Sequence, residues 1–189
     1  MIVINEFPRA SVLNSFLYDA VCENVCYAVK EKADGAKPAA MTKYDFHNQN
    51  IKEIDELTSW ISRVLPDVSK KFAATGTPPL MLHSHEDEKG YNFNINSFEI
   101  ASCWGILYNG NESLREHNHF PALLAFAYYV RTPKGSAPIT IEGESYNVKE
   151  GQCIFFLSSQ YHSVDQSQGA GRCAVVGNII YSGYTGFGG

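Results

Sequence analysis

The sequence predicts an α+β protein in which a double-stranded β-helix, or jelly roll, is supported by helices from the N-terminal half. Three observations predict it: apolar residues at helical spacing before about residue 98, short strand-like runs after it, and glycine-rich turns between those runs. A chain of 189 residues fits one domain. We therefore expect a single domain over 1–189, with helical support in 1–97, the jelly-roll core in 98–182 and a glycine-rich tail in 183–189.

The helical part contains two stretches with apolar residues on one stripe. The first covers 11–31, with Ser11 as the expected N-cap after Pro8. The second covers 51–73, and Pro66 is expected to kink or split it. The apolar residues are Val12, Leu13, Phe16, Leu17, Ala20, Val21, Ala28 and Val29 in the first, and Ile51, Ile54, Leu57, Ile61, Val64, Leu65, Val68 and Phe72 in the second. The segment "ADGAKPAA" between them is expected to be a loop.

The strand-like part contains four apolar runs: "EIASCWGILY", "ALLAFAYYV", "CIFFL" and "CAVVGNIIY". The first places Ile100, Trp104, Ile106 and Tyr108 on alternate positions, which predicts that they share one face of a strand. Turn-forming segments separate the runs: "NGNES", "TPKGSAP", "EGES", "KEG" and "QSQGAG". Many short strands joined in this way indicate a sandwich or barrel.

Composition and charge exclude several classes of protein. Hydrophobic residues make up 44% and charged residues 19%, and with a net charge of -5 no strongly basic face for non-specific nucleic-acid binding is evident, which leaves a local basic patch open. No apolar run approaches the roughly 20 residues that span a bilayer. The N-terminus "MIVINEFPRA" lacks the pattern of a signal peptide. We expect a cytoplasmic protein (in the host cytoplasm if it is a phage protein) without nucleic-acid or membrane partners; the sequence does not indicate an oligomeric state.

The five cysteines do not predict a disulfide framework, because their number is odd and their spacings are wide. Cys22 and Cys26 would share a face of the first predicted helix, but no second pair follows at zinc-site spacing. We interpret the cysteines as buried thiols. They are Cys22, Cys26, Cys103, Cys153 and Cys173.

The segment "EHNHFP" carries two histidines, His117 and His119, that share a face if the backbone is extended. On spacing alone, two half-exposed side chains near a strand start are the simpler interpretation. His162, directly after the strand "CIFFL", adds a third nitrogen donor, because a later strand of a jelly roll can lie beside the one that carries the pair. Such an open site suits non-haem iron, although the usual set has two histidines and one carboxylate.

Arg172 follows His162 by ten residues, at the start of the strand "RCAVVGNI". An arginine that faces the interior of a barrel requires an anion, because an unpaired buried charge is costly. A bound dicarboxylate would supply one and accept two parallel hydrogen bonds. A surface arginine at a strand start is the alternative.

The order of these segments, "HNHFPALLAFAYYV", "VKEGQCIFFLSSQYHSV" and "GRCAVVGNI", resembles the 2-oxoglutarate- and Fe(II)-dependent oxygenases of the prolyl-hydroxylase-like superfamily, in particular a branch from phages and bacteria. The resemblance covers about Ser102 to Tyr181. It implies that His117 and His162 bind Fe(II), and that His119 stands where most members have an aspartate. It also implies that Arg172 pairs with the distal carboxylate of 2-oxoglutarate. Further cosubstrate contacts would come from three residues: Tyr108, Tyr129 and Asn178.

Two departures from the branch are notable. Phe126 stands where the branch has glycine, which would fill the barrel more fully. The carboxylate of the metal site is missing, and the nearby Glu116 and Asp165 would each need a bulge to bind the ion.

The resemblance implies an enzyme that consumes O2 and 2-oxoglutarate, releases succinate and CO2, and hydroxylates an unidentified small molecule or peptide. Two alternatives stay open: a cupin-like three-histidine metalloenzyme that does not use 2-oxoglutarate, and a non-catalytic jelly-roll binding module. Arg172 separates the first alternative from the oxygenase, because that alternative requires no anion at Arg172. Failure to take up metal would favour the second.

A second cluster, in "LHSHEDEKG", places His83, His85 and Asp87 at alternate positions. The segment is strongly polar and follows "TGTPP", so we interpret it as a solvated loop, with a lid or a second metal site as alternatives. His47 has no partner that the sequence indicates.

Overall fold

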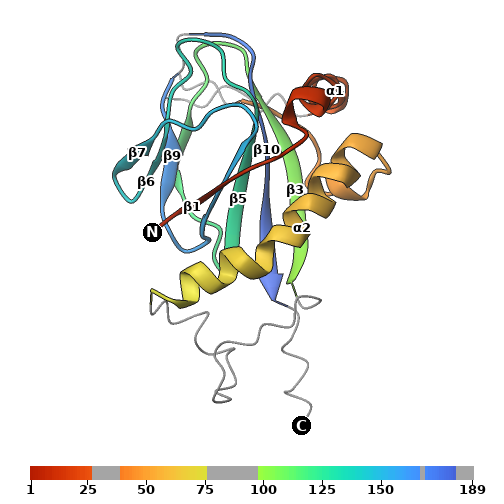
Figure 1. Cartoon of the computed structure of the whole chain (residues 1–189). Helices are drawn as coiled ribbons and strands as arrows, with labels where there is room; N and C mark the ends of the chain where they lie inside the picture. The colour runs from red at the N-terminus through yellow and green to blue at the C-terminus, as the bar shows by residue number, and fades with distance from the viewer. Residues whose placement is uncertain (27–38, 76–97, 167–168, 182–189) are drawn as a thin grey trace.

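The computed structural model describes residues 1–26, 39–75, 98–166 and 169–181, which form two antiparallel sheets and two α-helices (Figure 1). In the larger sheet the strands run in the order β1-β8-β5-β10-β3-β2, and in the smaller β4-β9-β6-β7. Apolar residues of both sheets form one cluster, so the sheets face each other across a shared interior. This arrangement confirms the predicted α+β class.

The strand bounds in the larger sheet are β1 Val3–Glu6, β8 Gln152–Leu157, β5 Leu124–Arg131, β10 Arg172–Tyr181, β3 Phe98–Tyr108 and β2 Ala40–Met41. Those in the smaller sheet are β4 Leu114–His117, β9 His162–Val164, β6 Ile139–Ile141 and β7 Glu144–Tyr146. The four predicted apolar runs correspond to β3, β5, β8 and β10. The N-terminal part, expected to be helical, also contributes the edge strands β1 and β2.

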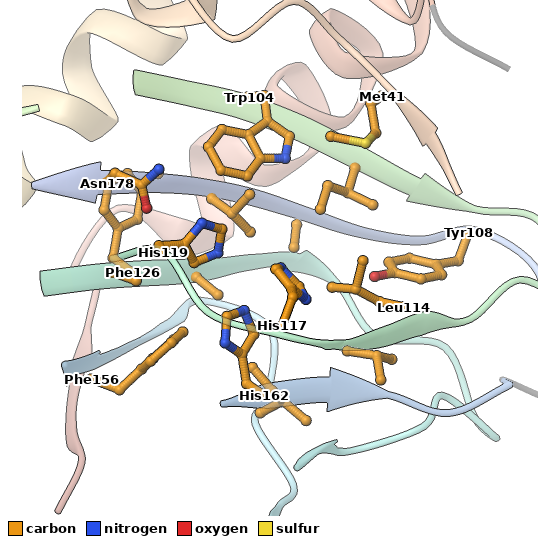
Figure 2. Close-up of a pocket in the computed structure, with 18 of the residues that line it drawn as sticks. Met41, Trp104, Tyr108, Leu114, His117, His119, Phe126, Phe156, His162 and Asn178 are labelled. Atoms are coloured by element: carbon orange, nitrogen blue, oxygen red, sulfur yellow. The ribbon is translucent and has the colours of Figure 1, made fainter. Parts of the chain in front are cut away.

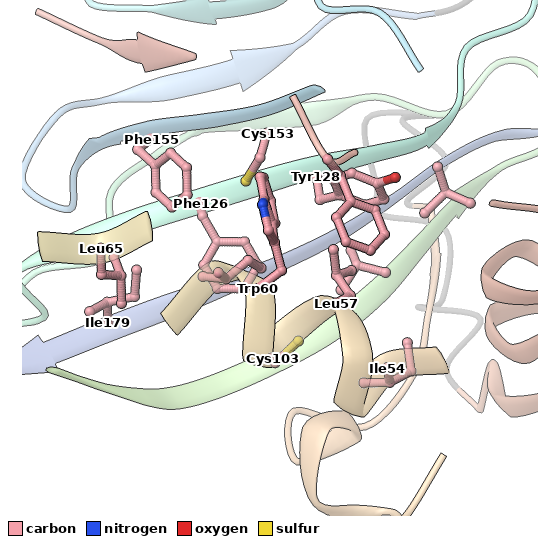
Figure 3. Packing of buried hydrophobic residues seen from close by; sticks show 14 of the residues in the cluster. Ile54, Leu57, Trp60, Leu65, Cys103, Phe126, Tyr128, Cys153, Phe155 and Ile179 are labelled. Atoms are coloured by element: carbon pink, nitrogen blue, oxygen red, sulfur yellow. The ribbon is translucent and has the colours of Figure 1, made fainter. Parts of the chain in front are cut away.

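Helix α2 (Lys52–Ala73) confirms the second predicted helix and packs on the outer face of the larger sheet (Figure 3). Its buried stripe includes Ile54, Leu57 and Leu65, which pack with the outward-facing residues of β3, β5, β8 and β10. Pro66 lies inside the helix and does not split it. A proline inside a helix costs about 3 kcal/mol. The packing of the buried stripe against the sheet offsets this cost, so the helix continues past Pro66.

Helix α1 (Ala10–Asn24) differs from its prediction at both ends. Arg9 is the N-cap residue, so Ser11 lies inside the helix rather than capping it. The helix stops before the predicted residue 31 because Val25 is extended and the amide of Cys26 donates to the carbonyl of Met41 at 3.0 Å. The prediction that Cys22 and Cys26 share a helix face is therefore wrong. The later part of the predicted helix lies outside the described residues.

All five cysteines are free thiols. Cys103, Cys153 and Cys173 are buried as predicted, whereas Cys22 is half-buried and Cys26 is exposed. Neither described α-helix combines the length and the apolar character that crossing a bilayer requires. A short 3-10 turn, η1 (Phe46–Asn48), precedes α2.

The predicted turn "EGES" joins β6 to β7, where Glu142 and Gly143 have φ values of 50° and 79°. Two consecutive residues with positive φ are typical of a tight hairpin turn. The strands on either side, β6 and β7, have three residues each, and the sequence pattern did not predict them as strands.

A register shift in the pairing of β3 with β10 corrects the predicted face of Ile100. Asn178 pairs with Ser102, but Ile179 pairs with Ile100, so one residue of β3 is skipped. Beyond this bulge the alternation is reversed. Ile100 therefore packs against the helix-side core, whereas Trp104 belongs to the interior between the sheets.

Phe126, which stands where the branch has glycine, lines the cavity between the sheets and also packs on the helix side of the larger sheet. Its ring belongs to the core on the helix side (Figure 3). Gly177 lies opposite it on β10. A Cβ atom on Gly177 would come within 2.6 Å of the Phe126 ring and 2.5 Å of the carbonyl oxygen of Ser102, so glycine makes room for this ring.

Candidate metal and anion site

The interior between the two sheets holds a cavity of about 610 Å³ (Figure 2). Part of its wall comes from inward-facing residues of β5 and β10, among them Ala125, Ala127 and Ala174. These small side chains leave space at positions where larger ones would close the interior. His117, His119, His162 and Arg172, the principal predicted site residues, all line the cavity.

The three predicted histidines come together at this cavity. His117 ends β4 and His162 begins β9, and the two are directly paired across these strands. His119 lies past the end of β4, where its amide donates to the carbonyl of Ser158 at 2.7 Å. The ligand atoms of the three imidazoles all lie within 4.8 Å of one another. The cluster contains neither Glu116 nor Asp165, although the pairing of β4 with β9 shifts register between Leu114 and His117 and Glu116 lines the cavity.

Backbone carbonyls orient two of the imidazole rings. Nδ1 of His117 lies 2.8 Å from the carbonyl oxygen of Arg115, and Nδ1 of His162 lies 3.3 Å from that of Gln160. A carbonyl only accepts, so Nδ1 carries the proton in each ring. This leaves Nε2 of both rings free to bind a metal ion, the arrangement that usually holds metal-binding histidines in place.

Burial keeps two of the histidines neutral. Burial and the neighbouring His117 lower the pKa of His119 from 6.5 to about 4. Burial, reinforced by the two other imidazoles, lowers the pKa of His162 from 6.5 to about 3. Metal ions bind neutral imidazole, so neither ring requires deprotonation at neutral pH before it binds.

Arg172 supplies a buried positive charge in the same cavity. It is only 2% exposed, and its Nε and Nη1 atoms are buried without a hydrogen-bond partner. Its guanidinium carbon lies 4.6 Å from the ring centroid of Tyr108 and 5.4 Å from that of Tyr129. The predicted cosubstrate residues Arg172, Tyr108 and Tyr129 are thus in mutual contact.

The two tyrosines cannot neutralise this arginine. Burial raises the pKa of Tyr108 and raises that of Tyr129 to about 12, and the charge of Arg172 opposes both shifts. Both phenols are therefore uncharged at neutral pH. The two aromatic faces contact the guanidinium, and its unused N–H donors remain for an anion that enters the cavity.

Asn178 and Trp104 line another part of the cavity wall. Asn178 Nδ2 donates to Ser102 Oγ at 3.0 Å, while its Oδ1 is buried without a partner. Trp104 was not predicted as a site residue. It is 5% exposed, its ring centroid lies 5.8 Å from that of His119, and its Nε1 is buried without a partner. The sequence indicated only that Trp104 shares a strand face with Tyr108, because the two stand at alternate positions.

The remaining predicted candidates lie either outside the described residues or outside the cavity wall. His83, His85 and Asp87 lie outside the described residues, as does the tail 183–189. His47 lies in η1 and is not part of the histidine cluster; burial lowers its pKa.

No family model matches the sequence, and no curated protein matches it. Solved structures do match. A prolyl-4-hydroxylase from Pseudomonas putida is 13% identical with a TM-score of 0.64, over 95% of this chain and 92% of that one. A viral collagen prolyl hydroxylase from Paramecium bursaria Chlorella virus-1, in its 2-oxoglutarate complex, is 10% identical with a TM-score of 0.65, over 94% of each chain.

A protein of the 2OG-Fe(II) oxygenase family from Burkholderia pseudomallei is 9% identical with a TM-score of 0.63, over 95% of this chain and 84% of that one. Identities this low establish similarity of fold alone. Because the alignments span nearly the whole chain, they include the supporting helices as well as the sheets. The chain therefore has the double-stranded β-helix fold of the 2-oxoglutarate- and Fe(II)-dependent oxygenases, as the sequence resemblance implied.

Proposed function

We propose that this protein is a 2-oxoglutarate- and Fe(II)-dependent oxygenase that hydroxylates a small molecule or peptide. The observation that carries the proposal is the buried guanidinium of Arg172, which has unpartnered N–H groups in the cavity that also holds the three histidines. A buried charge without a partner is costly, so this site is built for an anion. The fold supports the same function.

The donor set fits a divalent transition metal. His117 and His162 would bind Fe(II) through Nε2, and His119 would complete the set. Three neutral imidazoles bring no negative charge, so a dianionic cosubstrate is well suited to balance the ion. When bound, the iron together with O2 and 2-oxoglutarate supplies the oxidising power for hydroxylation, and the cosubstrate leaves as succinate and CO2.

The residues of the chain would bind and orient the cosubstrate and exclude water from the site. Arg172 would pair with the distal carboxylate of 2-oxoglutarate through two parallel hydrogen bonds, a geometry that fixes both distance and direction. Tyr108 and Tyr129 both contact the guanidinium, whose carbon lies 4.6 Å and 5.4 Å from their ring centroids. The apolar wall around them keeps water from competing for these hydrogen bonds.

The absence of a carboxylate from the histidine cluster favours one alternative, a cupin-like three-histidine metalloenzyme that does not use 2-oxoglutarate. That alternative leaves Arg172 buried without a role. The oxygenase accounts for both the histidines and the arginine, which is why we favour it.

The test is metal uptake followed by cosubstrate turnover. We expect the wild-type protein to bind one equivalent of Fe(II) under anaerobic conditions and to convert 2-oxoglutarate to succinate in air. His162→Ala should lose metal, and Arg172→Met should keep metal but lose turnover. Arg131→Met is the matched control, because Arg131 also stacks over a tyrosine, at 4.8 Å from the Tyr18 ring centroid, but does not line the cavity.

Two results would contradict the proposal. Undiminished succinate formation by Arg172→Met would remove the cosubstrate role of this residue. Failure of the wild-type protein to take up Fe(II), Ni(II) or Co(II) would favour the non-catalytic binding module instead.

A further inference from the structure

We infer that Trp104 and Ser158 are positioning residues of the metal centre: they hold the imidazole of His119 in the place of the third ligand and do not bind the ion themselves. The inference rests on the proposed function, which makes His119 a ligand of Fe(II). It adds two residues to which neither the sequence pattern nor the resemblance gave a role in metal binding.

His119 differs from the other two histidines in what fixes the direction of its ring. His117 and His162 lie in paired strands, and each has Nδ1 beside a backbone carbonyl oxygen, at 2.8 Å and 3.3 Å. His119 lies past the end of β4, where the alternation of a strand no longer sets the direction of a side chain. Within the described part of the chain, no hydrogen bond joins its ring nitrogens to another residue. Its ring therefore depends on packing contacts for its orientation.

The indole ring of Trp104 supplies such a contact from the larger sheet. Its centroid lies 5.8 Å from that of His119, and the two ring planes are inclined by 56°. The ring centroids of His117 and His162 lie 4.9 Å and 5.0 Å from that of His119. In Figure 2 the ring of His119 lies between the indole and the other two imidazoles. A rotation of this ring out of the histidine cluster would therefore lose its contact with Trp104.

Trp104 is itself fixed well enough to orient a neighbouring ring. It lies within β3, pairs with Val176 of β10, and is only 5% exposed. The ring of Tyr44 meets the indole edge-on, with centroids 4.8 Å apart. Tyr44 is in turn tied to β3, because its carbonyl accepts a hydrogen bond from the amide of Cys103 at 2.8 Å. The contact from Trp104 to His119 thus comes from a rigid element of the sheet.

Ser158 fixes the main chain that carries His119. It directly follows β8 and is buried. Its carbonyl accepts from the amide of His119 at 2.7 Å, and its own amide donates to the carbonyl of Leu123 at 3.2 Å. Its hydroxyl donates to the carbonyl of Ala122. One buried serine therefore ties both ends of the segment 119–123 to the end of β8, and with it the main-chain position of the third histidine.

Contacts of this kind raise the affinity for a metal ion because they orient the ligand before it binds. A side chain that is already in place loses less conformational freedom on binding, and a site held by its neighbours keeps the required geometry. The ligand atoms of the three histidines lie within 4.8 Å of one another, as a shared ion requires. Loss of either contact should therefore weaken metal binding through His119 alone.

The experiment is a double-mutant cycle on the affinity of the intact protein for Co(II), measured by competition with a chelator. Trp104→Leu removes the aromatic ring, and Ser158→Ala removes only the hydroxyl. Each is made in the wild-type chain and in the His119→Ala variant. Trp104→Phe keeps an aromatic ring. Ile106→Val is the matched control, because Ile106 also lies on β3 and lines the cavity but has no ring to contact His119.

We expect Trp104→Leu to weaken Co(II) binding roughly 3- to 10-fold and Ser158→Ala roughly 3-fold. Both losses should disappear in the His119→Ala variant, because the ring on which these residues act is then gone. Trp104→Phe should weaken binding less than Trp104→Leu, and Ile106→Val should bind as the wild type does. The visible absorption of Co(II) bound to Trp104→Leu should shift towards that of His119→Ala, since the third nitrogen ligand is held less well.

A merely structural role would give a different pattern. Equal losses of affinity with and without His119 would show that Trp104 and Ser158 support the cavity as a whole, and would overturn the inference. Unchanged affinity in Trp104→Leu and Ser158→Ala would overturn it too. If Trp104→Leu does not fold, Trp104→Phe and Ser158→Ala complete the same cycle.

The failure of the inference is distinguishable from the failure of the proposed function. Wild-type affinity for Co(II) in His119→Ala would show that His119 is not a ligand, which overturns the inference and leaves the proposed function with His117 and His162. Failure of the wild-type protein to bind Co(II) at all would instead remove the proposed function, and the inference with it.

Discussion

Replacing Arg172 by methionine should have opposite effects on the empty and the ligand-bound protein. In the ligand-free protein Arg172 is buried against two tyrosine rings, and its Nε and Nη1 atoms have no hydrogen-bond partner. Methionine keeps an unbranched chain of similar length and removes the charge and the unmet donors. We therefore expect Arg172→Met to stabilise the ligand-free protein and to abolish most of its stabilisation by 2-oxoglutarate.

The magnitude follows from the contacts of the guanidinium. Two unsatisfied N–H groups cost about 1–3 kcal/mol each. Against this, the variant loses two cation–π contacts of about 0.5–2 kcal/mol each. The midpoints of these ranges, about 4 and 2.5 kcal/mol, leave a net gain of about 1.5 kcal/mol in the free energy of unfolding. For a chain of this size, 1 kcal/mol raises the unfolding temperature by about 2–4 °C.

The ligand-bound protein should respond in the opposite direction. At a cosubstrate concentration 100-fold above its dissociation constant, the wild-type protein gains about 2.7 kcal/mol of stability. Loss of one member of a buried charge pair costs about 2 kcal/mol or more, a roughly 30-fold loss of affinity. The same concentration is then only about 3-fold above the dissociation constant of the variant, and the gain falls to about 0.8 kcal/mol.

Thermal unfolding of the Ni(II)-loaded protein with and without 2-oxoglutarate measures both effects, and calorimetric titration with N-oxalylglycine measures the affinity directly. Ni(II) prevents turnover during the scan. Arg131→Met serves as the control for loss of a stacked arginine outside the cavity. A variant that is stabilised by 2-oxoglutarate as strongly as the wild type would refute the reasoning, as would a loss of several kcal/mol in the ligand-free protein.

Three further predictions follow from the same contacts. The metal-free protein should lose stability as the pH falls from 6.5 towards 4. In this range His119 and His162 become protonated in the unfolded chain but stay neutral in the folded protein, because their pKa values are lowered there. Urea unfolding at several pH values measures the free energy of unfolding, and a value that does not change with pH would contradict this. Gly177→Ala should destabilise the protein by about 1–3 kcal/mol in urea unfolding, since the added methyl group meets the Ser102 carbonyl and the Phe126 ring. His119→Asp should raise the affinity for Fe(II) in competition with a chelator, because a carboxylate adds a negative charge to the ligand set; a lower affinity would show that all three imidazoles are needed.

The three histidines and Arg172 could be selected from the sequence because metal binding and anion binding follow from the side-chain types and from their positions near strand ends. Alternation placed His117 and His119 on one face, and the strand before His162 brought this residue to the same sheet. His119 in fact lies past the end of β4, held by the carbonyl of Ser158. The three histidines do come together, but only His117 lies in a strand as the alternation assumed, and their role as metal ligands stays a prediction.

Other features depend on contacts that a sequence pattern does not contain. The reversal at Ile100 comes from a skipped residue in the pairing of β3 with β10. The end of α1 comes from a hydrogen bond between Cys26 and Met41, fifteen residues apart. The edge strand β1 is four residues long and is a strand because it pairs with β8, which a local sequence pattern does not reveal. Such long-range pairing decides the structure of short segments against their local preference.

Trp104 shows the same limit at the level of function. Its place in an alternating strand predicted only that it faces the interior, where an aromatic residue is usually part of the core. What marks it as a candidate for binding is that its Nε1 is buried without a partner in the cavity wall, while its ring centroid lies 5.8 Å from that of His119. Buried polar groups are nearly always paired within a folded protein. Unpaired atoms on Arg172, Trp104 and Asn178, all lining one cavity, therefore indicate that the missing partners are supplied by ligands, and at Arg172 the positive charge calls for an anion.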